Sequence, residues 1–134
     1  MNYFLDTDIC IYYLNGERSV VDGIHRLSPD RVKVPSIVQA ELIEGALATQ
    51  HSKRNLEIIE AFCSPFEIVP FCRQCTAHYG RIRHHLRIKG AMIGPNDLII
   101  AATVIAHHGT LITHNTKEFN RVPDIKLHDI FAVN

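Results

Sequence analysis

The sequence predicts an α/β protein with a mostly parallel β-sheet. Short apolar runs of strand length alternate with longer stretches whose apolar residues follow helical spacing, and this order is typical of folds in which helices connect parallel strands. Hydrophobic residues make up 46% of the chain, which is enough for a core. No repeat, low-complexity tract or long linker divides the 134 residues, so we expect a single domain over 1–134.

Five strands are expected from short apolar runs that are bounded by turn or breaker residues. The second run ends at Pro35 and the third ends at Pro70, and proline cannot donate a hydrogen bond to a neighbouring strand. The expected strands are 3–5, 32–34, 66–69, 110–113 and, as an edge strand, 125–127.

Six helices are expected between these strands. Asp8 is expected to cap the first helix, and Ser36 and Gln39 have the spacing of a capping box. Gly90 and Gly109 stand where two later helices should end. The expected helices are 8–15, 17–28, 36–49, 52–63, 72–89 and 96–108.

No apolar run approaches the roughly 18–20 residues that span a bilayer, and the first residues lack the basic region of a signal peptide. We therefore expect a soluble cytoplasmic protein that does not contact membranes. Cys72 and Cys75 form a C-x-x-C pair, with His78 three residues later. A zinc site needs four ligands and no second cysteine pair exists. Two half-buried helix residues are expected in preference to a zinc or redox site.

The 14 basic and 14 acidic residues balance, so the chain has no overall basic character. Between Glu67 and Asp97, however, no acidic residue occurs. This segment forms either a face that attracts phosphates or an ordinary solvated helix surface, and its composition leaves both open. Its basic residues include Arg81, Arg83, Arg87 and Lys89.

Four carboxylates occur at positions suited to a site. In parallel sheets the ligand site lies at the carboxyl ends of the strands, and Asp6 directly follows the first strand. Glu41 and Asp97 lie among apolar helix residues, and Glu118 lies in a polar loop after the fourth strand. Capping, the helix dipole or exposure would explain each acid alone. Gathered at one edge they would need a cation, and oxygen ligands favour Mg²⁺ or Mn²⁺.

Five segments resemble motifs of the VapC-type PIN-domain toxins, in the same order along the chain. They are FLDTDI at 4–9, SIVQAEL followed by EGA at 36–46, YGRIR at 79–83, IGPNDLIIAA at 93–102 and LITHNTKEFNRV at 111–122. Together they extend over nearly the whole chain. Asp8 stands where members often carry Asn, and since both residues cap helices, capping is its expected role.

The resemblance implies a PIN-like three-layer α/β/α fold, with a mostly parallel sheet of about five strands and helices on both faces. It implies an acidic catalytic pocket formed by Asp6, Glu41, Asp97 and Glu118, in which Asp6 and Asp97 bind Mg²⁺ with help from Glu41. Members carry Asp, Glu or no acid at the position of Glu118. Hydrogen-bonding support is expected from Thr7, Ser36, Thr113 and Asn115, and RNA contacts from Arg81, Arg83, Arg87 and Lys89.

The function that the resemblance implies is a metal-dependent endoribonuclease, the toxin of a toxin–antitoxin pair. It would hydrolyse structured RNA, with the anticodon stem-loop of initiator tRNA as a candidate, and leave 3′-hydroxyl and 5′-phosphate ends. The implied partners are a VapB-like antitoxin and a second copy in a homodimer.

Three other interpretations fit parts of the sequence. One is a catalytically silent PIN-like module that binds RNA or a partner. The phosphate chemistry alone would also permit a DNA-directed nuclease. A haloacid-dehalogenase-like phosphatase, suggested by Asp6 and Asp8, lacks the glycine that should follow its second aspartate and a late pair of acids.

Overall fold

The computed structural model describes residues 1–131, and within them it contains one sheet of five parallel strands. The strand order is β3-β2-β1-β4-β5, and every neighbouring pair is parallel. The prediction of a mostly parallel sheet of about five strands is confirmed. The strands are β1 (Tyr3–Leu5), β2 (Val32–Pro35), β3 (Glu67–Val69), β4 (Thr110–Ile112) and β5 (Lys126–His128).

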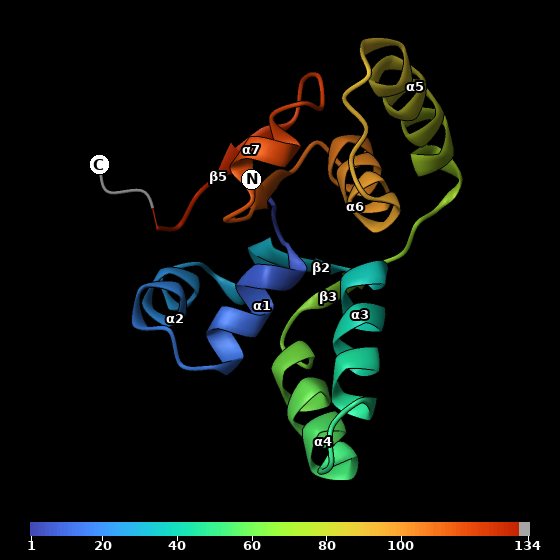
Figure 1. Cartoon of the computed structure of the whole chain (residues 1–134). Coiled ribbons are helices and arrows are strands. Elements are labelled where there is room, and N and C mark those ends of the chain that lie inside the picture. The colour runs from blue at the N-terminus through green and yellow to red at the C-terminus, as the bar shows by residue number, and fades with distance from the viewer. Residues whose placement is uncertain (132–134) are drawn as a thin grey trace.

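The strand order explains how the helices are distributed. The chain moves outward from β1 through β2 to β3, and then returns past β1 to form β4 and β5 on the other side. Right-handed crossovers then place α1–α4 on one face of the sheet and α5–α7 on the other, as Figure 1 shows. The helices are α1 (Thr7–Leu14), α2 (Arg18–His25), α3 (Ser36–Leu47), α4 (Ser52–Cys63), α5 (Arg73–Lys89), α6 (Pro95–Ala106) and α7 (Thr116–Phe119), with a 3₁₀ turn at Pro29–Arg31.

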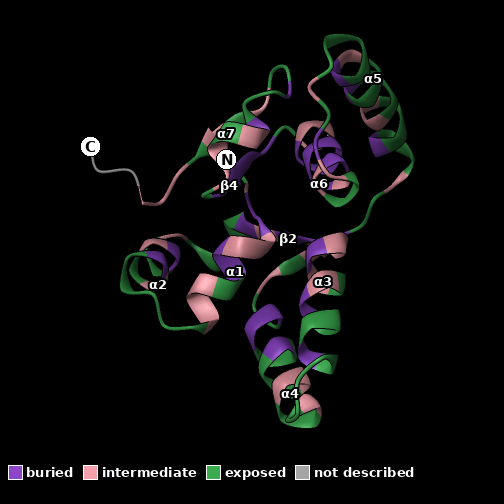
Figure 2. Cartoon of the chain, in the orientation of Figure 1, coloured by how far each residue is buried: buried purple, intermediate pink, exposed green. Residues whose placement is uncertain are grey.

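The core lies between the strands and the inner sides of the helices (Figure 2). Strand β4 is buried at all three residues, and α6 buries six of its twelve, which explains why that helix is so apolar in sequence. Helices α3 and α4 pack as one hairpin and α5 and α6 as another. Among the described residues, no helix combines the length and apolar character that crossing a membrane requires.

Several helix ends differ from the predictions. Asp6, and not Asp8, is the N-cap of α1, because its carboxylate accepts the hydrogen bond from the Thr7 backbone N–H at 2.8 Å. The predicted capping box is also wrong, since Ser36 is already the first residue of α3 and its N-cap is Pro35.

The ends of α5 and α6 differ in kind. Gly90 ends α5 with a positive φ of 63°, as expected from the freedom of glycine in the left-handed region. After α6, the residue with a positive φ is His108. Gly109 serves close packing instead, because a Cβ built on it would lie 2.4 Å from the Phe4 ring.

Candidate active site

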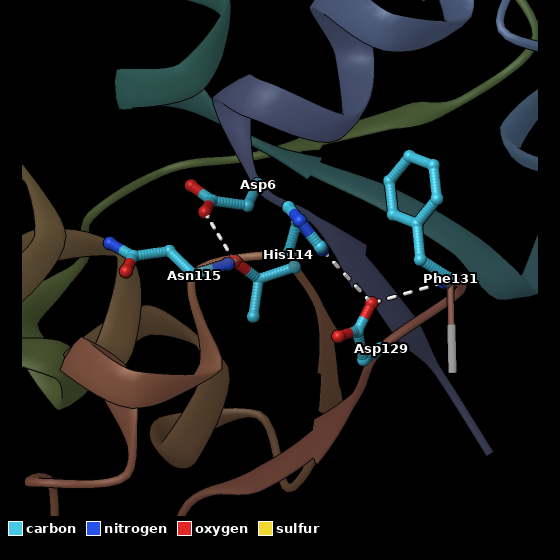
Figure 3. A network of polar contacts seen from close by, with 6 residues as sticks. Asp6, His114, Asn115, Asp129 and Phe131 are labelled. Carbon is cyan, nitrogen blue, oxygen red and sulfur yellow. Dashed lines mark hydrogen bonds and ion pairs between the residues drawn. The ribbon is translucent and has the colours of Figure 1, made fainter. Parts of the chain in front are cut away.

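The candidate site lies at the switch point of the sheet, where successive strands stop extending the sheet on one side of β1 and begin to extend it on the other. Strands β1 and β4 are neighbours in the sheet, but their crossovers run along opposite faces, and ligand sites of parallel sheets typically lie beyond the carboxyl ends of two such strands. Asp6 follows β1 and Thr113 follows β4. The Thr113 hydroxyl donates a hydrogen bond to Asp6 Oδ2 at 2.7 Å, and both residues are buried. Figure 3 shows Asp6 facing the segment of His114 and Asn115.

Glu41 joins Asp6 through Thr7. The Thr7 hydroxyl donates to Glu41 Oε1 at 2.9 Å, which connects the first turn of α1 to the second turn of α3. Glu41 is half-buried, whereas Ala40 and Ile43 beside it are exposed. The apolar neighbours of Glu41 in the sequence are therefore not all buried, because α3 packs through a narrow stripe at every fourth residue and Glu41 lies beside that stripe.

Glu118 is held by two groups from different segments. Its Oε1 accepts the Gly94 backbone N–H at 3.1 Å, and its Oε2 accepts the side-chain amide of Asn115. The Asn115 backbone N–H in turn donates to the Thr113 hydroxyl at 3.0 Å. The sequence predicted a loop here, but residues 116–119 form the single turn α7, which directs Glu118 toward the start of α6.

The pKa values indicate that the carboxylates lie within one electrostatic field. Burial, followed by the charge of Asp8, raises the pKa of Asp6 to about 7. The pKa of Asp97 also rises to about 7, through burial and then through the charges of Glu118, Asp6 and Glu41. Burial acts in the same direction on Glu118, but the pKa of Glu118 is lowered overall by its bonds from Gly94, Asn115 and Asp97. The structure therefore brings the four predicted acids together.

Asp8 also belongs to this cluster of acids, although the sequence predicted that it would cap a helix. Burial raises the pKa of Asp8, and the charge of Asp8 in turn raises the pKa of Asp6. The Oδ1 atom of Asp8 is buried and has no hydrogen-bond partner among the described residues. The alternating Asp6-Thr7-Asp8 pattern after a strand was the sequence signal for this role. Arg121 was also missed, and its charge helps to lower the pKa of Glu118.

Three of the four residues that were predicted to support the acids contact them. Thr7, Thr113 and Asn115 hydrogen-bond to the acids. Ser36, the half-buried first residue of α3, is not among the described residues that do so.

The four basic residues of α5 are exposed and form no ion pair among the described residues. At about 100° per residue, Arg83 and Arg87 share one side of the helix, while Arg81 lies about 200° from Arg83. Lys89 lies nearer to the side of Arg81. The buried Ile82 and Leu86 separate the two sides. Helix α5 therefore has two basic flanks and no single basic face.

The site also contacts the described end of the chain. His114 Nδ1 lies 3.4 Å from Asp129 Oδ1, and that carboxylate accepts the Phe131 backbone N–H at 3.0 Å (Figure 3). The His114 ring packs edge-on to Phe131, with 4.6 Å between centroids, and Tyr12 packs against both rings. This cluster fixes the segment after β4 beside Asp6.

The donor set suits a hard cation with few protein ligands. All the acids offer oxygen, the donor that Mg²⁺ and Mn²⁺ prefer. Among residues 1–131, no three His, Cys, Asp or Glu side chains are placed so that they could surround one ion. That arrangement does not fit an all-protein metal cage. It fits Mg²⁺, which typically takes one or two carboxylates and completes its shell with water and substrate phosphate.

Comparison with known proteins gives concordant results. Residues 3–125 match the PIN domain family. The chain is similar to Ribonuclease VapC2 of Rickettsia felis, with 39% identity over 96% of this chain and 98% of that protein. It is 33% identical, at the same coverage, to the tRNA(fMet)-specific endonuclease VapC of Salmonella typhimurium. A crystal structure of VapBC2 from Rickettsia felis bound to a promoter DNA fragment superimposes with a TM-score of 0.90, at 38% identity over 96% of this chain and 98% of that one.

Proposed function

Since the chain belongs to the PIN-domain family and is a VapC-type ribonuclease, we propose that it is a Mg²⁺-dependent endoribonuclease and the toxin of a toxin–antitoxin pair. The observation that carries the proposal is the convergence of Asp6, Glu41, Asp97 and Glu118 in one electrostatic field at the β1/β4 switch point. Carboxylates with pKa values raised in this way are stabilised in their charged forms by a cation.

Asp6 and Asp97 would hold Mg²⁺ directly, and Glu41 would act on the ion through a bound water. When bound there, Mg²⁺ supplies an activated water and neutralises charge on the phosphate. Thr113 and the Thr7 backbone fix both oxygens of Asp6, so the carboxylate is oriented before substrate arrives. Thr7 also holds one oxygen of Glu41. In-line attack of water on the phosphodiester expels the 3′-oxygen and leaves 3′-hydroxyl and 5′-phosphate ends.

Glu118 has a different role in this scheme. Its lowered pKa keeps it charged, and its hydrogen bonds tie the Gly94 turn before α6 to Asn115 after β4. It thereby positions Asp97, whose carboxylate lies in its field. Arg83 and Arg87, on one flank of α5, are the proposed contacts to the RNA backbone, and Arg81 and Lys89 would contact it from the other flank.

The proposed substrate is structured RNA, and the tRNA-specific relative makes the anticodon stem-loop of initiator tRNA the first candidate. The test is cleavage of total RNA and of initiator tRNA by antitoxin-free protein with Mg²⁺. Parallel reactions contain EDTA, Asp97→Asn protein or a DNA of the same sequence. Discrete fragments with 5′-phosphate ends are expected only from RNA, with Mg²⁺ and the unaltered protein.

Three results would contradict the proposal. Cleavage that persists in EDTA would exclude metal dependence. Equal cleavage of DNA would exclude RNA selectivity. Binding of RNA without any cleavage by folded protein would favour the silent module.

The proposed partner is a VapB-like antitoxin, and the complex would bind its own promoter, since VapBC2 of Rickettsia felis was crystallised on a DNA fragment from its promoter. An apolar groove of about 390 Å³ between α1, α3 and α4 fits a peptide segment of such a partner. Its lining includes Ile11, Leu42 and Ile58 together with Glu41, so an occupant would contact one of the four acids. Ile58→Asp should weaken antitoxin binding and leave RNA cleavage unchanged.

A second copy in a homodimer is also proposed, and sedimentation of the free protein tests it.

A further inference from the structure

The start of α5 holds two cysteines whose arrangement the ribonuclease function does not use. Cys72 is the N-cap of the helix, and Cys75 is its third residue. Their sulfur atoms lie 3.6 Å apart, and the Cys75 backbone N–H donates to the Cys72 carbonyl at 2.9 Å. Two thiols at this distance can close a disulfide by a small rotation of their side chains, without movement of the helix.

The two thiols have unequal surroundings. Cys72 is half-buried, whereas Cys75 is completely buried. The pKa of Cys72 is lowered by the hydrogen bond from the Cys75 thiol and by the backbone N–H groups of Cys75 and Gln74 in the first helical turn. Burial raises the pKa of Cys75. One sulfur is thus an accessible nucleophile and the other is a protected thiol beside it.

A metal site does not account for the pair. Among residues 1–131, no group of three or more His, Cys, Asp or Glu side chains is placed to hold a metal ion, so His78 does not complete a site with the two cysteines. Zinc bound through two thiolates alone would lack half of its ligands.

We propose that Cys72 and Cys75 form a thiol–disulfide exchange site that reacts with low-molecular-mass disulfides such as oxidised glutathione. The Cys72 thiolate attacks one sulfur of the disulfide, which forms a mixed disulfide and releases one thiolate. Cys75 then loses its proton to solvent and attacks the Cys72 sulfur, which releases the second thiolate. The protein loses two electrons and two protons, and the small disulfide gains them as two thiols.

The pair lies away from the acidic site. Cys75 contacts Thr103, near the end of α6, whereas Asp97 lies in the first turn of the same helix. Asp97 and Thr103 are six positions apart, which corresponds to roughly 9 Å along the helix axis. The exchange chemistry therefore does not depend on the nuclease activity, and each can be tested without the other.

The other two cysteines provide an internal control. Cys10 and Cys63 are buried, and burial raises the pKa of both thiols. In the folded protein, Cys72 should react with oxidised glutathione at least about 10-fold faster than either, because reactivity follows thiolate content and access. In urea this difference should disappear, since it arises from the fold.

The experiment exposes the reduced full-length protein to glutathione buffers of increasing oxidised fraction, followed by acid quenching, alkylation of free thiols and peptide mass analysis. A disulfide joining Cys72 and Cys75 is expected, with Cys10 and Cys63 alkylated. Cys75→Ser should trap glutathione on Cys72. Cys72→Ser should not react there, although serine still caps the helix. RNA cleavage should be unchanged in both variants.

Two results would overturn the proposal. One is a wild-type protein in which Cys72 retains glutathione without closing the disulfide. The other is a folded protein in which Cys72 reacts no faster than Cys63. Because neither readout involves RNA, either result would leave the proposed ribonuclease function intact.

Discussion

The amino end of the parallel sheet is closely packed, whereas its carboxyl end carries a cluster of carboxylates. Gly109 lies against the Phe4 ring at the amino end, and the Thr110 backbone N–H donates to the Asn2 carbonyl at 2.9 Å. At the other end of the same two strands, Asp6 and Thr113 meet inside a cluster of carboxylates. The first arrangement stabilises the fold, and the second opposes it.

The difference shows how one sheet separates stability from function. Buried carboxylates that repel one another cost folding free energy, and such a cost is maintained where it serves a reaction. Among residues 1–131, no buried carboxylate lies at the amino end, so the residues there can be packed closely. Changes at the two ends should therefore act in opposite ways, and each of the following substitutions tests that contrast.

The largest effect is expected from Asp6→Asn, at the carboxyl end. It should reduce RNA cleavage by at least about 10²-fold, the order lost when one group that acts in the transition state is removed. The unfolding free energy should not fall, because a repelling charge is also removed. Initial cleavage rates and urea unfolding measure the two effects. The exposed Asp22→Asn is the control, and a cleavage loss caused by unfolding would contradict the contrast.

Gly109→Ala should have the opposite signature, at the amino end. The added Cβ would lie 2.4 Å from a ring that is only 1% exposed and cannot move aside, so the unfolding free energy should fall by about 1–3 kcal/mol. Cleavage per folded molecule should stay the same. Gly45→Ala is the matched control, because its Cβ would meet nothing within 4 Å, and it should stabilise α3 by about 0.5–1 kcal/mol. Equal stabilities of the two variants would be incompatible with the close approach.

Asp97→Asn sharpens the contrast through pH. The pKa of Asp97 rises from 3.8 to about 7 on folding, so its contribution to stability is complete below pH 4 and is lost as the pH rises to 7. Without metal, the variant should equal the wild type at pH 4 and exceed it by about 1–2 kcal/mol at pH 8, after discounting the full shift for partial exposure. Urea unfolding in EDTA at several pH values measures this. A pH-independent difference would argue against it.

The sequence predicted the sheet and most helices, because short apolar runs and helical periodicity are local signals. It also predicted Asp6, since a residue after the first strand must lie at the carboxyl edge. It could not show that Asp8 joins this cluster instead of capping α1, because both roles suit an aspartate at that position. The Glu118 contact to Gly94 was equally hidden, since it connects residues 24 positions apart through α7, a turn too short to show periodicity.

The smallest effect is expected from Thr113→Val, which compares the two ends of β4 directly. Valine keeps the shape of threonine but removes the hydroxyl that donates to Asp6 and accepts from the Asn115 backbone N–H. Because the hydrogen bond from Thr113 lowers the pKa of Asp6, its loss should raise that pKa further and increase the Mg²⁺ concentration needed for half-maximal cleavage at pH 7. An increase of about 3- to 10-fold corresponds to the typical net value of one hydrogen bond.

Thr110→Val is the matched control, because Thr110 is also buried in β4 and, among the described residues, its hydroxyl donates only to the Met1 sulfur, at 3.7 Å. This variant should keep the wild-type Mg²⁺ requirement. Raising the pH to 8.5 should partly restore the requirement of Thr113→Val, because Asp6 is then ionised again. If both variants change the Mg²⁺ requirement equally, the hydroxyl of Thr113 does not position Asp6, and the contrast between the two ends of the sheet rests on the acids alone.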